Sequence, residues 1–205
     1  MNHAFIRAVP DFRKSIAILM LLAVAPLLSA CGYNTIPTAE ENAKAAWSEV
    51  LNQYQRRADL IPNLVETVKG YAAHEKDVLE SVVEARAKAT QVTVSPETLS
   101  DPNAFRQFQE NQAGLTSALS RLLAVVENYP DLKANQNFME FQQALEETEN
   151  EISMSRRYYN GAVRNLNVSV ESFPSTLIAR QFGFVKAEYF EIEDEADRAV
   201  PKVKF

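Results

Sequence analysis

The sequence predicts an all-α protein, an antiparallel four-helix bundle followed by an extended C-terminal tail. Three observations support this fold. Apolar residues recur at alternating spacings of four and three, which places them along one side of a helix and buries them against neighbouring helices. Proline and polar turn residues interrupt the repeat, and the short connections favour antiparallel neighbours. The chain has only five glycines and few segments of alternating hydrophobicity, which argues against a sizeable sheet.

The first helix is expected to begin at Thr38, because Thr38 and Glu41 stand at the spacing of a capping box. A boundary near residues 70–74 should separate it from a second helix over about residues 74–91. Without that boundary the first helix would run for more than about fifty residues, or about 80 Å, twice the length of its partners. The buried stripe of the first helix consists of Trp47, Leu51, Tyr54, Ala58, Ile61, Val65, Val68 and Ala72.

Asp101-Pro102 predicts the start of the third helix, since aspartate accepts a hydrogen bond from a free amide and proline needs no amide partner there. The helix should end by Asn128, because Pro130 disfavours a helical conformation at the residue before it. Its apolar stripe consists of Phe105, Phe108, Gln112, Leu115, Leu119, Leu122 and Val126.

The fourth helix is predicted over about residues 135–165. A short helix should start at Phe173-Pro174 and end at Gly183, and residues 186–205 are expected to be extended and acidic. The stripe of the fourth helix consists of Phe138, Phe141, Leu145, Thr148, Ile152, Ser155 and Tyr159.

The N-terminus has the order of a secretory leader, in which a basic segment precedes an apolar one. Residues 1–15 carry Arg7, Arg13 and Lys14, and residues 16–28 are almost wholly apolar. This run is shorter than the roughly 20 apolar residues that cross a bilayer as a helix. We therefore expect a signal peptide over residues 1–30, with a permanent transmembrane anchor and an ordinary cleaved leader as the alternatives.

The tetrad Leu28-Ser29-Ala30-Cys31 resembles the bacterial lipobox. The resemblance implies cleavage before Cys31, a diacylglyceryl thioether on its sulfur and a further acyl chain, such as palmitate, on the new amino terminus. Two or more chains anchor a protein stably where one does not. The expected partner of Cys31 is thus a bacterial membrane on its extracytoplasmic side. Gly32 replaces the aspartate that often retains lipoproteins at the inner membrane, which favours the outer membrane in a Gram-negative cell.

This interpretation divides the chain into a signal peptide, a tether over residues 31–37, a helical bundle over residues 38–185 and a tail over residues 186–205. The formal net charge is −6, and loss of the leader would make it more negative because the leader is basic. Nucleic acid is therefore not expected as a partner. Acylation of Cys31 would also consume the only thiol, which excludes disulfides and cysteine metal sites from the mature chain.

No catalytic or metal-binding pattern stands out in the mature chain. His74 is its only histidine, so the paired histidines of a zinc helix and the Glu-x-x-His pairs of a di-iron bundle are both missing. No Gly-x-Ser-x-Gly turn is present either. We expect neither an enzyme nor a cofactor-binding protein.

Pro62 falls inside the first helix, whose apolar stripe continues on both sides of it. A proline there removes the amide that would bond the Ala58 carbonyl, so a kink is expected. Asn63 and Arg57 are the nearby side chains that could bond the freed carbonyl. The bend could serve packing, or it could form a polar notch for a ligand.

The stretch around Pro62 resembles the signature of the LemA family. It reads Gln55-Arg56-Arg57-Ala58-Asp59-Leu60-Ile61-Pro62-Asn63-Leu64-Val65, and later blocks follow in the family's order, among them Tyr129-Pro130-Asp131, Arg156-Arg157-Tyr158-Tyr159-Asn160 and Phe182-Gly183-Phe184. The resemblance covers nearly the whole mature chain. It implies a four-helix bundle similar to the bromodomain-like arrangement, tethered to a membrane near its N-terminus, with no settled biochemical activity. The lipobox departs from the transmembrane anchor that is more usual in the family.

Charged residues on the predicted fourth helix allow two interpretations. Glu149 could pair with Arg156 on a solvated face, or it could pair across helices with Arg56 or Arg57 and fix the register of the bundle. Tyr159 lies on the apolar stripe and is expected to fill the core.

Two functions remain open from the sequence. The first is a non-enzymatic, lipid-anchored module that docks or scaffolds an unidentified envelope protein, with Arg56, Arg57, Asp59, Pro62, Asn63, Glu149, Arg156 and Tyr159 as candidate interaction or structural residues. The alternative is a small-ligand-binding or sensing module that uses the notch at Pro62. Self-association through exposed helix faces, in the manner of a coiled coil, is a further possibility.

Overall fold

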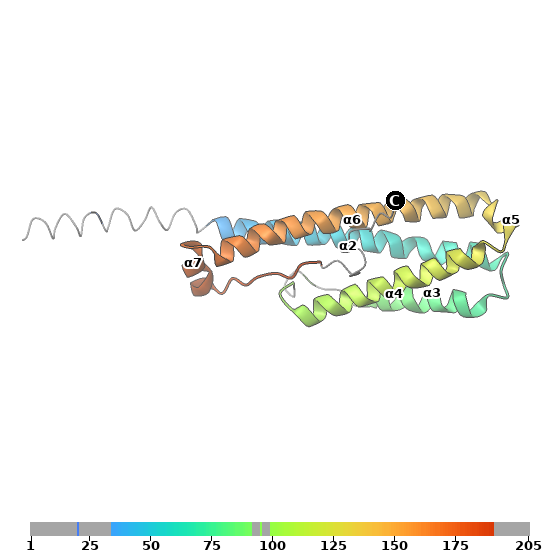
Figure 1. Cartoon of the computed structure of the whole chain (residues 1–205), viewed down its shortest axis with the longest axis horizontal. Coiled ribbons are helices and arrows are strands. Elements are labelled where there is room, and N and C mark those ends of the chain that lie inside the picture. The colour runs from blue at the N-terminus through green and yellow to red at the C-terminus, as the bar shows by residue number, and fades with distance from the viewer. Residues whose placement is uncertain (1–19, 21–33, 92–94, 96–98, 191–205) are drawn as a thin grey trace, which may run out of the picture.

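The computed structural model describes residues 20, 34–91, 95 and 99–190 and contains six helices in this part of the chain (Figure 1). They are α2 (Thr35–Lys69), α3 (Lys76–Gln91), α4 (Pro102–Val126), α5 (Pro130–Lys133), α6 (Gln136–Glu171) and α7 (Ser175–Phe182). No strand occurs among these residues, so the all-α prediction is confirmed. The leader apart from Met20, the predicted lipidation site Cys31 and residues 191–205 lie outside the described residues.

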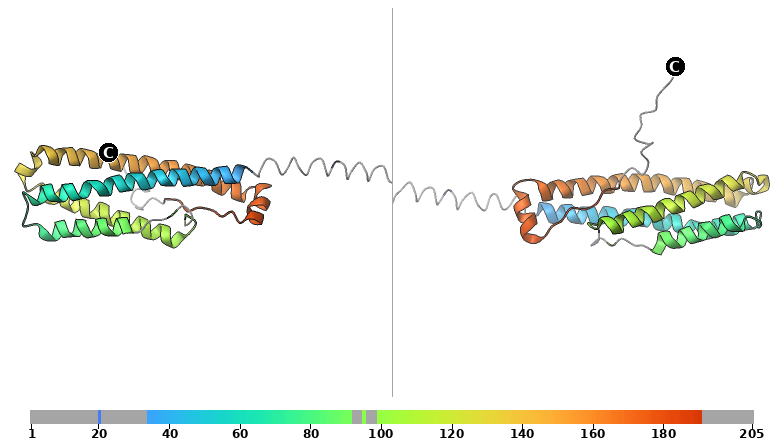
Figure 2. Two further views of the ribbon diagram at one scale, coloured as in Figure 1. Left: turned by 180° about the vertical axis from the view of Figure 1, so that it is seen from behind. Right: turned by 60° about the horizontal axis from the view of Figure 1, so that its bottom comes forward.

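The four long helices form an elongated rod in which successive helices run in opposite directions (Figures 1 and 2). α2 packs along α6, α3 packs along α4, and α2 also contacts α3. A helix of 35 residues is about 50 Å long, so α2 and α6 each extend over most of the rod. Within the described part of the chain, no helix is both long enough and apolar enough to span a membrane.

The start of α2 differs from the expected capping box. The N-cap is Asn34, and the Thr38 hydroxyl donates a 2.7 Å hydrogen bond to the Asn34 carbonyl inside the first turn. The helix therefore begins at Thr35, because Ile36 is fully buried and packs in the core. The expected tether over residues 31–37 thus overlaps the first turn of α2. The expected boundary after α2 is present, since α2 ends at Lys69 and α3 begins at Lys76.

The start of α4 is as predicted. The Asp101 carboxylate accepts hydrogen bonds from the amides of Asn103 at 2.9 Å and Ala104 at 3.3 Å, with Pro102 as the first helical residue. The additional helix α5 was expected as a turn. It forms because Leu132 is fully buried at the end of the bundle and holds this segment against the core.

The helix α6 runs six residues further than expected. Its buried face continues through Val163, Leu166 and Asn167, so tertiary packing sustains the helix to Glu171. The short helix α7 follows and ends at Gly183, where φ is +75°. Glycine adopts this left-handed conformation without the steric cost that a side chain would add.

The core consists of two apolar clusters arranged along the rod. One is built around six aromatic side chains in the half of the rod where α2 begins, and the other lies near the α2–α3 connection. Between them stands a layer that contains the buried polar residues Arg57, Gln112 and Thr148. The aromatic set consists of Trp47, Tyr54, Phe105, Phe108, Tyr159 and Phe190, whose ring centroids lie 5.0 to 6.1 Å from neighbouring rings of the set.

Residues 184–190 are extended, as expected, but they do not form a tail outside the bundle. Phe190 is buried with its ring 5.8 Å from that of Trp47, and Ala187 is buried as well. The boundary expected at residue 185 therefore falls inside the packed unit, which reaches at least to Phe190. The cause is tertiary, because the aromatic cluster is complete only with the ring of Phe190.

Candidate functional site

Arg57 is the most buried charged residue among those that the structure describes, with 1 % of its surface exposed. Its guanidinium group donates to the Glu149 carboxylate of α6 at 2.7 Å and to the Gln112 side-chain oxygen of α4 at 2.7 Å. It also donates to the Thr116 hydroxyl at 3.0 Å and stands 5.1 Å from the centre of the Tyr54 ring. Gln112 in turn donates to the Ala89 carbonyl at 3.1 Å, which includes α3 in the network.

The Arg57 network thus connects all four long helices at the layer between the two apolar clusters. Of the two pairings left open by the sequence, the interhelical one between Glu149 and Arg57 is present. The neighbouring Arg56 is exposed to solvent. A buried charge is tolerated only when it is paired and hydrogen-bonded, so this network fixes which residues of the four helices stand at the same level.

The residues around Pro62 do not form an open notch. α2 continues as an α-helix through Pro62, and the Ala58 carbonyl that the proline frees accepts a 2.7 Å hydrogen bond from Nε of Arg86 on α3. The expected partners Asn63 and Arg57 do not make this bond, because Asn63 faces solvent and Arg57 is engaged elsewhere. The sequence did not single out Arg86, because only the packing of α3 on α2 brings it there.

Asp59 also faces solvent and accepts a hydrogen bond from Gln55, one turn earlier on the same helix, at 2.8 Å. Arg156 lies over the ring of Phe190, 4.5 Å from its centre. Of the candidate residues of the sequence, Arg57 and Tyr159 are therefore buried, and Glu149 and Arg156 of α6 contact buried groups from partly exposed positions. The others are exposed on α2: Arg56, Asp59, Pro62 and Asn63.

Tyr159 and two asparagines of α6 hold the extended C-terminal segment. The Tyr159 hydroxyl donates to the Glu188 carbonyl at 2.9 Å, and burial strongly raises the pKa of this phenol. Asn160 binds both the amide and the carbonyl of Phe190, at 2.9 and 3.0 Å, and Asn167 does the same for Ala187 at 3.0 Å. These side chains thus bond backbone groups of residues 187–190 that a neighbouring strand would bond in a sheet.

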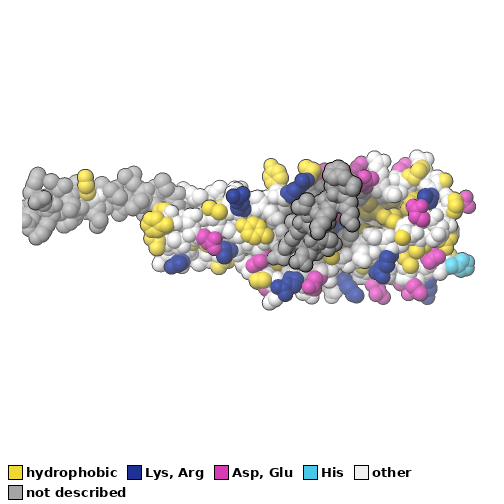
Figure 3. Space-filling model, in the orientation of Figure 1, with side chains coloured by type: hydrophobic (Ala, Val, Ile, Leu, Met, Phe, Trp, Pro, Cys, Tyr) yellow, Lys and Arg dark blue, Asp and Glu magenta, His cyan; other side chains and the backbone are white. Residues whose placement is uncertain are grey.

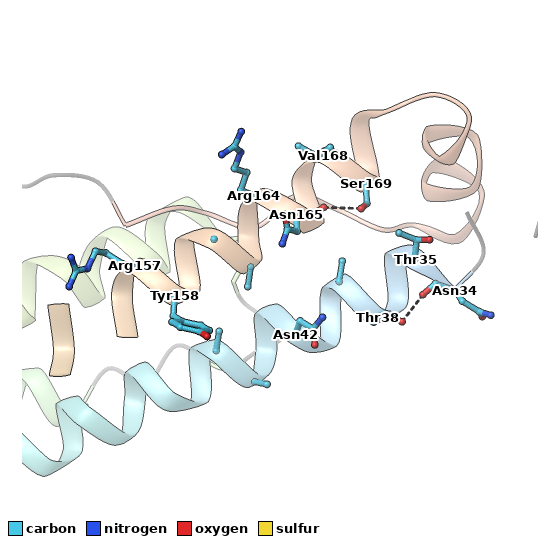
Figure 4. Close-up of a pocket in the computed structure, with 15 residues that line it drawn as sticks. Asn34, Thr35, Thr38, Asn42, Arg157, Tyr158, Arg164, Asn165, Val168 and Ser169 are labelled. Carbon is cyan, nitrogen blue, oxygen red and sulfur yellow. Dashed lines mark hydrogen bonds between the residues drawn. The ribbon is translucent and has the colours of Figure 1, made fainter. Parts of the chain in front are cut away.

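A groove of about 1470 Å³ lies between the first turns of α2 and the last turns of α6 (Figure 4). Small side chains form much of its floor, and the exposed Tyr158 and Val168 border it. Arg157 and Arg164 also line it, and none of its lining residues is acidic. The lining consists of Asn34, Thr35, Thr38, Ala39, Asn42, Ala45, Ala46, Arg157, Tyr158, Gly161, Ala162, Arg164, Asn165, Val168 and Ser169.

Two hydroxyl groups of the groove are already bonded within their own helices. Thr38 donates to the Asn34 carbonyl at 2.7 Å and Ser169 donates to the Asn165 carbonyl at 2.8 Å (Figure 4). The volume of the groove exceeds the roughly 300 to 1,000 Å³ of a typical small-molecule site, and the groove is open to solvent. Its shape suits a polypeptide segment better than a small ligand.

No group of three or more histidine, cysteine, aspartate or glutamate side chains that could hold a metal ion occurs in the described part of the chain. His74 is exposed in the connection between α2 and α3, at the end of the rod far from the groove (Figure 3).

The comparisons with known proteins agree with this architecture. A sequence model of the LemA family matches residues 46–205, which is most of the chain. The chain belongs to the LemA family. Among its relatives is the magnetosome protein MamQ 2 of Paramagnetospirillum magneticum, 27 % identical over 184 residues that cover 82 % of this chain and 68 % of the relative.

Two further relatives have similar identity. The magnetosome protein MamQ of Magnetospirillum gryphiswaldense is 25 % identical over 202 residues, 91 % of this chain and 74 % of the relative. Protein LemA of Metamycoplasma hominis is 24 % identical over 140 residues, 68 % of this chain and 59 % of the relative. The match of the LemA model spans the Arg57 network, the α6 side of the groove and the segment that contains Phe190, whereas the α2 side of the groove, apart from Ala46, precedes it.

Proposed function

We propose that this LemA-family protein is a lipid-anchored, non-enzymatic docking module of the bacterial cell envelope. Its fold is a four-helix bundle supplemented by the short helices α5 and α7. The single observation that carries the docking proposal is the groove between α2 and α6, a large open surface of small side chains with two arginines and no lining acidic residue. Cys31 would carry the acyl chains on the extracytoplasmic side of the membrane.

The position of the groove fits an anchored protein. Cys31 precedes Asn34 by three residues, and three residues span at most about 11 Å. Asn34 itself lines the groove. An acyl group on Cys31 would therefore hold the groove close to the membrane surface, where it would meet the membrane-proximal part of another envelope protein.

The chemistry of the groove defines the partner. Small residues on two adjacent helices permit close approach of a third helix, as small residues do at other helix interfaces. Arg157 and Arg164 lie two turns apart on α6 and favour a partner with carboxylates at a similar spacing. We infer that the groove binds an amphipathic helical segment that carries acidic side chains.

The alternative function, ligand binding at Pro62, has no supporting observation. Arg86 satisfies the freed carbonyl, and the neighbouring Ile61 and Leu64 are fully buried. A cavity lined by Ala58 and Gln112 has a volume of about 180 Å³, which is below the range of ordinary small-molecule sites.

Photo-crosslinking in living cells tests the docking proposal. Gly161 lies in the groove, and Gly114 lies on the exposed side of α4. An added side chain at either glycine would meet nothing within 4 Å, which makes the two positions a matched pair. We expect a benzophenone amino acid at Gly161 to give a discrete cross-link to another envelope protein, and the same probe at Gly114 to give none.

The charge of the groove supplies the second arm of the experiment. The double variant Arg157→Glu with Arg164→Glu should abolish the Gly161 cross-link while the protein remains folded by circular dichroism. Cross-links from Gly161 only to residues 191–205 of the same chain, or only to a second copy, would contradict docking of another protein. Equal cross-linking from Gly114 would contradict the assignment of the groove.

A further inference from the structure

The helix α7 and the residue before Pro174 expose large apolar side chains at one end of the rod. Phe173 is 80 % exposed and Leu177 is 59 % exposed, whereas Ala179 is buried and Ile178 packs against the core. Ala179 and Ile178 therefore hold this short helix against the core, while Phe173 and Leu177 expose apolar surface to solvent. We call Phe173 and Leu177 the apolar tip. Clustered exposed apolar side chains of this kind mark interaction sites more often than single ones do.

The apolar tip lies at the end of the rod where α2 begins. α7 lies beside the start of α2 in each view of Figures 1 and 2, and hydrophobic side chains gather at that end of the surface (Figure 3). Asn34 of α2 and Ser169 of α6 line the same groove, which places the end of α6 beside the start of α2.

The chain that precedes Asn34 brings this end to a membrane. It comprises 33 residues, with the apolar run over residues 16–28 and with Cys31 only three residues from Asn34. An acyl chain on Cys31 would place the start of α2 within about 11 Å of the lipid surface, and a retained apolar leader that ends at residue 28 would place it within about 22 Å. The exposed Arg180 adds a cation to α7, and Glu171 at the end of α6 is paired with Lys186 at 2.8 Å.

We propose that the apolar tip inserts into the interfacial region of the membrane as a second point of attachment. The inference rests on the proposed membrane tether and adds a contact that the tether does not require. Aromatic and aliphatic side chains beside basic residues are the composition of segments that lie in a bilayer interface. Two attachments at the same end hold the rod upright on the membrane, whereas a tether alone leaves it free to tilt.

Tryptophan quenching in vesicles tests the contact. The full chain, purified from membranes, is reconstituted into vesicles of phosphatidylethanolamine and phosphatidylglycerol with brominated acyl chains. The single native tryptophan, Trp47, is fully buried and gives a background that brominated lipid does not quench. New tryptophans are introduced by Phe173→Trp or Leu177→Trp at the tip, and by Met139→Trp near the opposite end, where the native side chain is 50 % exposed.

We expect at least a twofold loss of the added emission for Phe173→Trp and Leu177→Trp, and no loss for Met139→Trp. Flotation of the same vesicles measures attachment separately. Flotation without quenching at the tip overturns the inference and leaves the tether intact. Equal quenching at all three positions shows a rod lying flat on the membrane and also overturns it. Failure to float overturns the tether, and the inference with it. Protection of the tip by a protein partner or a second copy would appear as a blue-shifted emission that brominated lipid does not quench, which contradicts insertion.

Discussion

Arg57 and Arg56 are adjacent in sequence and have opposite environments. Arg57 is enclosed by Glu149, Gln112 and Thr116, whereas Arg56 faces water. The Glu149 side chain is 44 % exposed, so it would regain water if its partner were removed. The Gln112 side chain is buried and would lose its bond. The cost of losing Arg57 is therefore mainly that of unsatisfied buried polar groups.

The variant Arg57→Met should lower the free energy of unfolding by about 1–3 kcal/mol, the usual cost of leaving a buried hydrogen-bonding group without a partner. The matched control Arg56→Met should change it by less than about 0.5 kcal/mol, as exposed substitutions do. Urea unfolding followed by circular dichroism measures both. Equal effects of the two variants would show that the network does not stabilise the bundle.

Burial of Tyr159 predicts a loss of stability in alkali. The pKa of its phenol is strongly raised in the folded protein because burial disfavours the charged form. In the unfolded chain the phenol loses its proton near pH 10. Above this pH the free energy of unfolding therefore falls by about 1.4 kcal/mol per pH unit, because only the unfolded state releases the proton. Tyr159→Phe should remove this contribution to the slope of the free energy of unfolding against pH between pH 10 and 11. Tyr158→Phe, at an exposed position, should leave that contribution in place. A wild-type slope in Tyr159→Phe would refute the assignment.

At the residue scale, sequence alone placed Tyr159 in the core and left open whether Glu149 pairs with Arg156 on the surface or across helices with Arg56 or Arg57. It could not decide between Arg56 and Arg57, because both positions can face a neighbouring helix. It also gave no signal for Asn160 and Asn167, since asparagines on a helix usually face water and acquire this role only when residues 187–190 return to α6.

Arg86 of α3 supplies the hydrogen-bond donor that Pro62 removes from α2. The proline leaves the Ala58 carbonyl without its intrahelical donor, and α3 supplies a guanidinium in its place. The helix can then continue with its apolar stripe intact. The Ala58 carbonyl, which lacks an intrahelical donor, thus forms a hydrogen bond between α2 and α3.

A double-mutant cycle tests this relation. Arg86→Met should destabilise the protein by about 1–3 kcal/mol, because it leaves the buried carbonyl of Ala58 unsatisfied. In a Pro62→Ala background the new amide can bond that carbonyl, so the cost of Arg86→Met should fall by about 1 kcal/mol or more. Strict additivity of the two substitutions would contradict the proposed exchange of donors.

The C-terminal segment should be released when its side-chain partners are removed. Asn160→Ala and Asn167→Ala each delete both bonds to one residue of the segment, so the amides of Phe190 and Ala187 should exchange with deuterium at least tenfold faster. Asn165→Ala, at an exposed position on the same helix, serves as the control. Unchanged exchange in both variants would show that the aromatic cluster alone holds the segment.

At the element scale, the apolar stripes predicted the existence and order of the four long helices, and Asp101-Pro102 predicted the start of α4. The differences lie at positions where tertiary packing overrides local signals. Ile36 extends the start of α2, Val163 and Leu166 extend α6, and Leu132 converts an expected turn into α5. The return of Phe190 to the core was not predictable, because no local pattern identifies its partners.

At the scale of the whole molecule, the rod has a polar layer between its two apolar clusters, and its two ends differ in composition. The end with the aromatic cluster also carries the groove, the apolar tip and the connection to Cys31. The opposite end contains the α2–α3 connection with the exposed His74. The groove itself could not be predicted from sequence, because it depends on the spacing of two helices distant in the chain.

We propose that acyl chains on Cys31 tether this rod to a membrane. Metabolic labelling with palmitate, followed by separation of soluble and membrane fractions, tests the tether when wild type is compared with Cys31→Ser. The wild type should take up label and pellet with membranes, and the variant should lose the label and appear in the soluble fraction. Absence of label in the wild type, or unchanged pelleting of Cys31→Ser, would contradict this proposal and would indicate that the apolar leader is retained as the anchor.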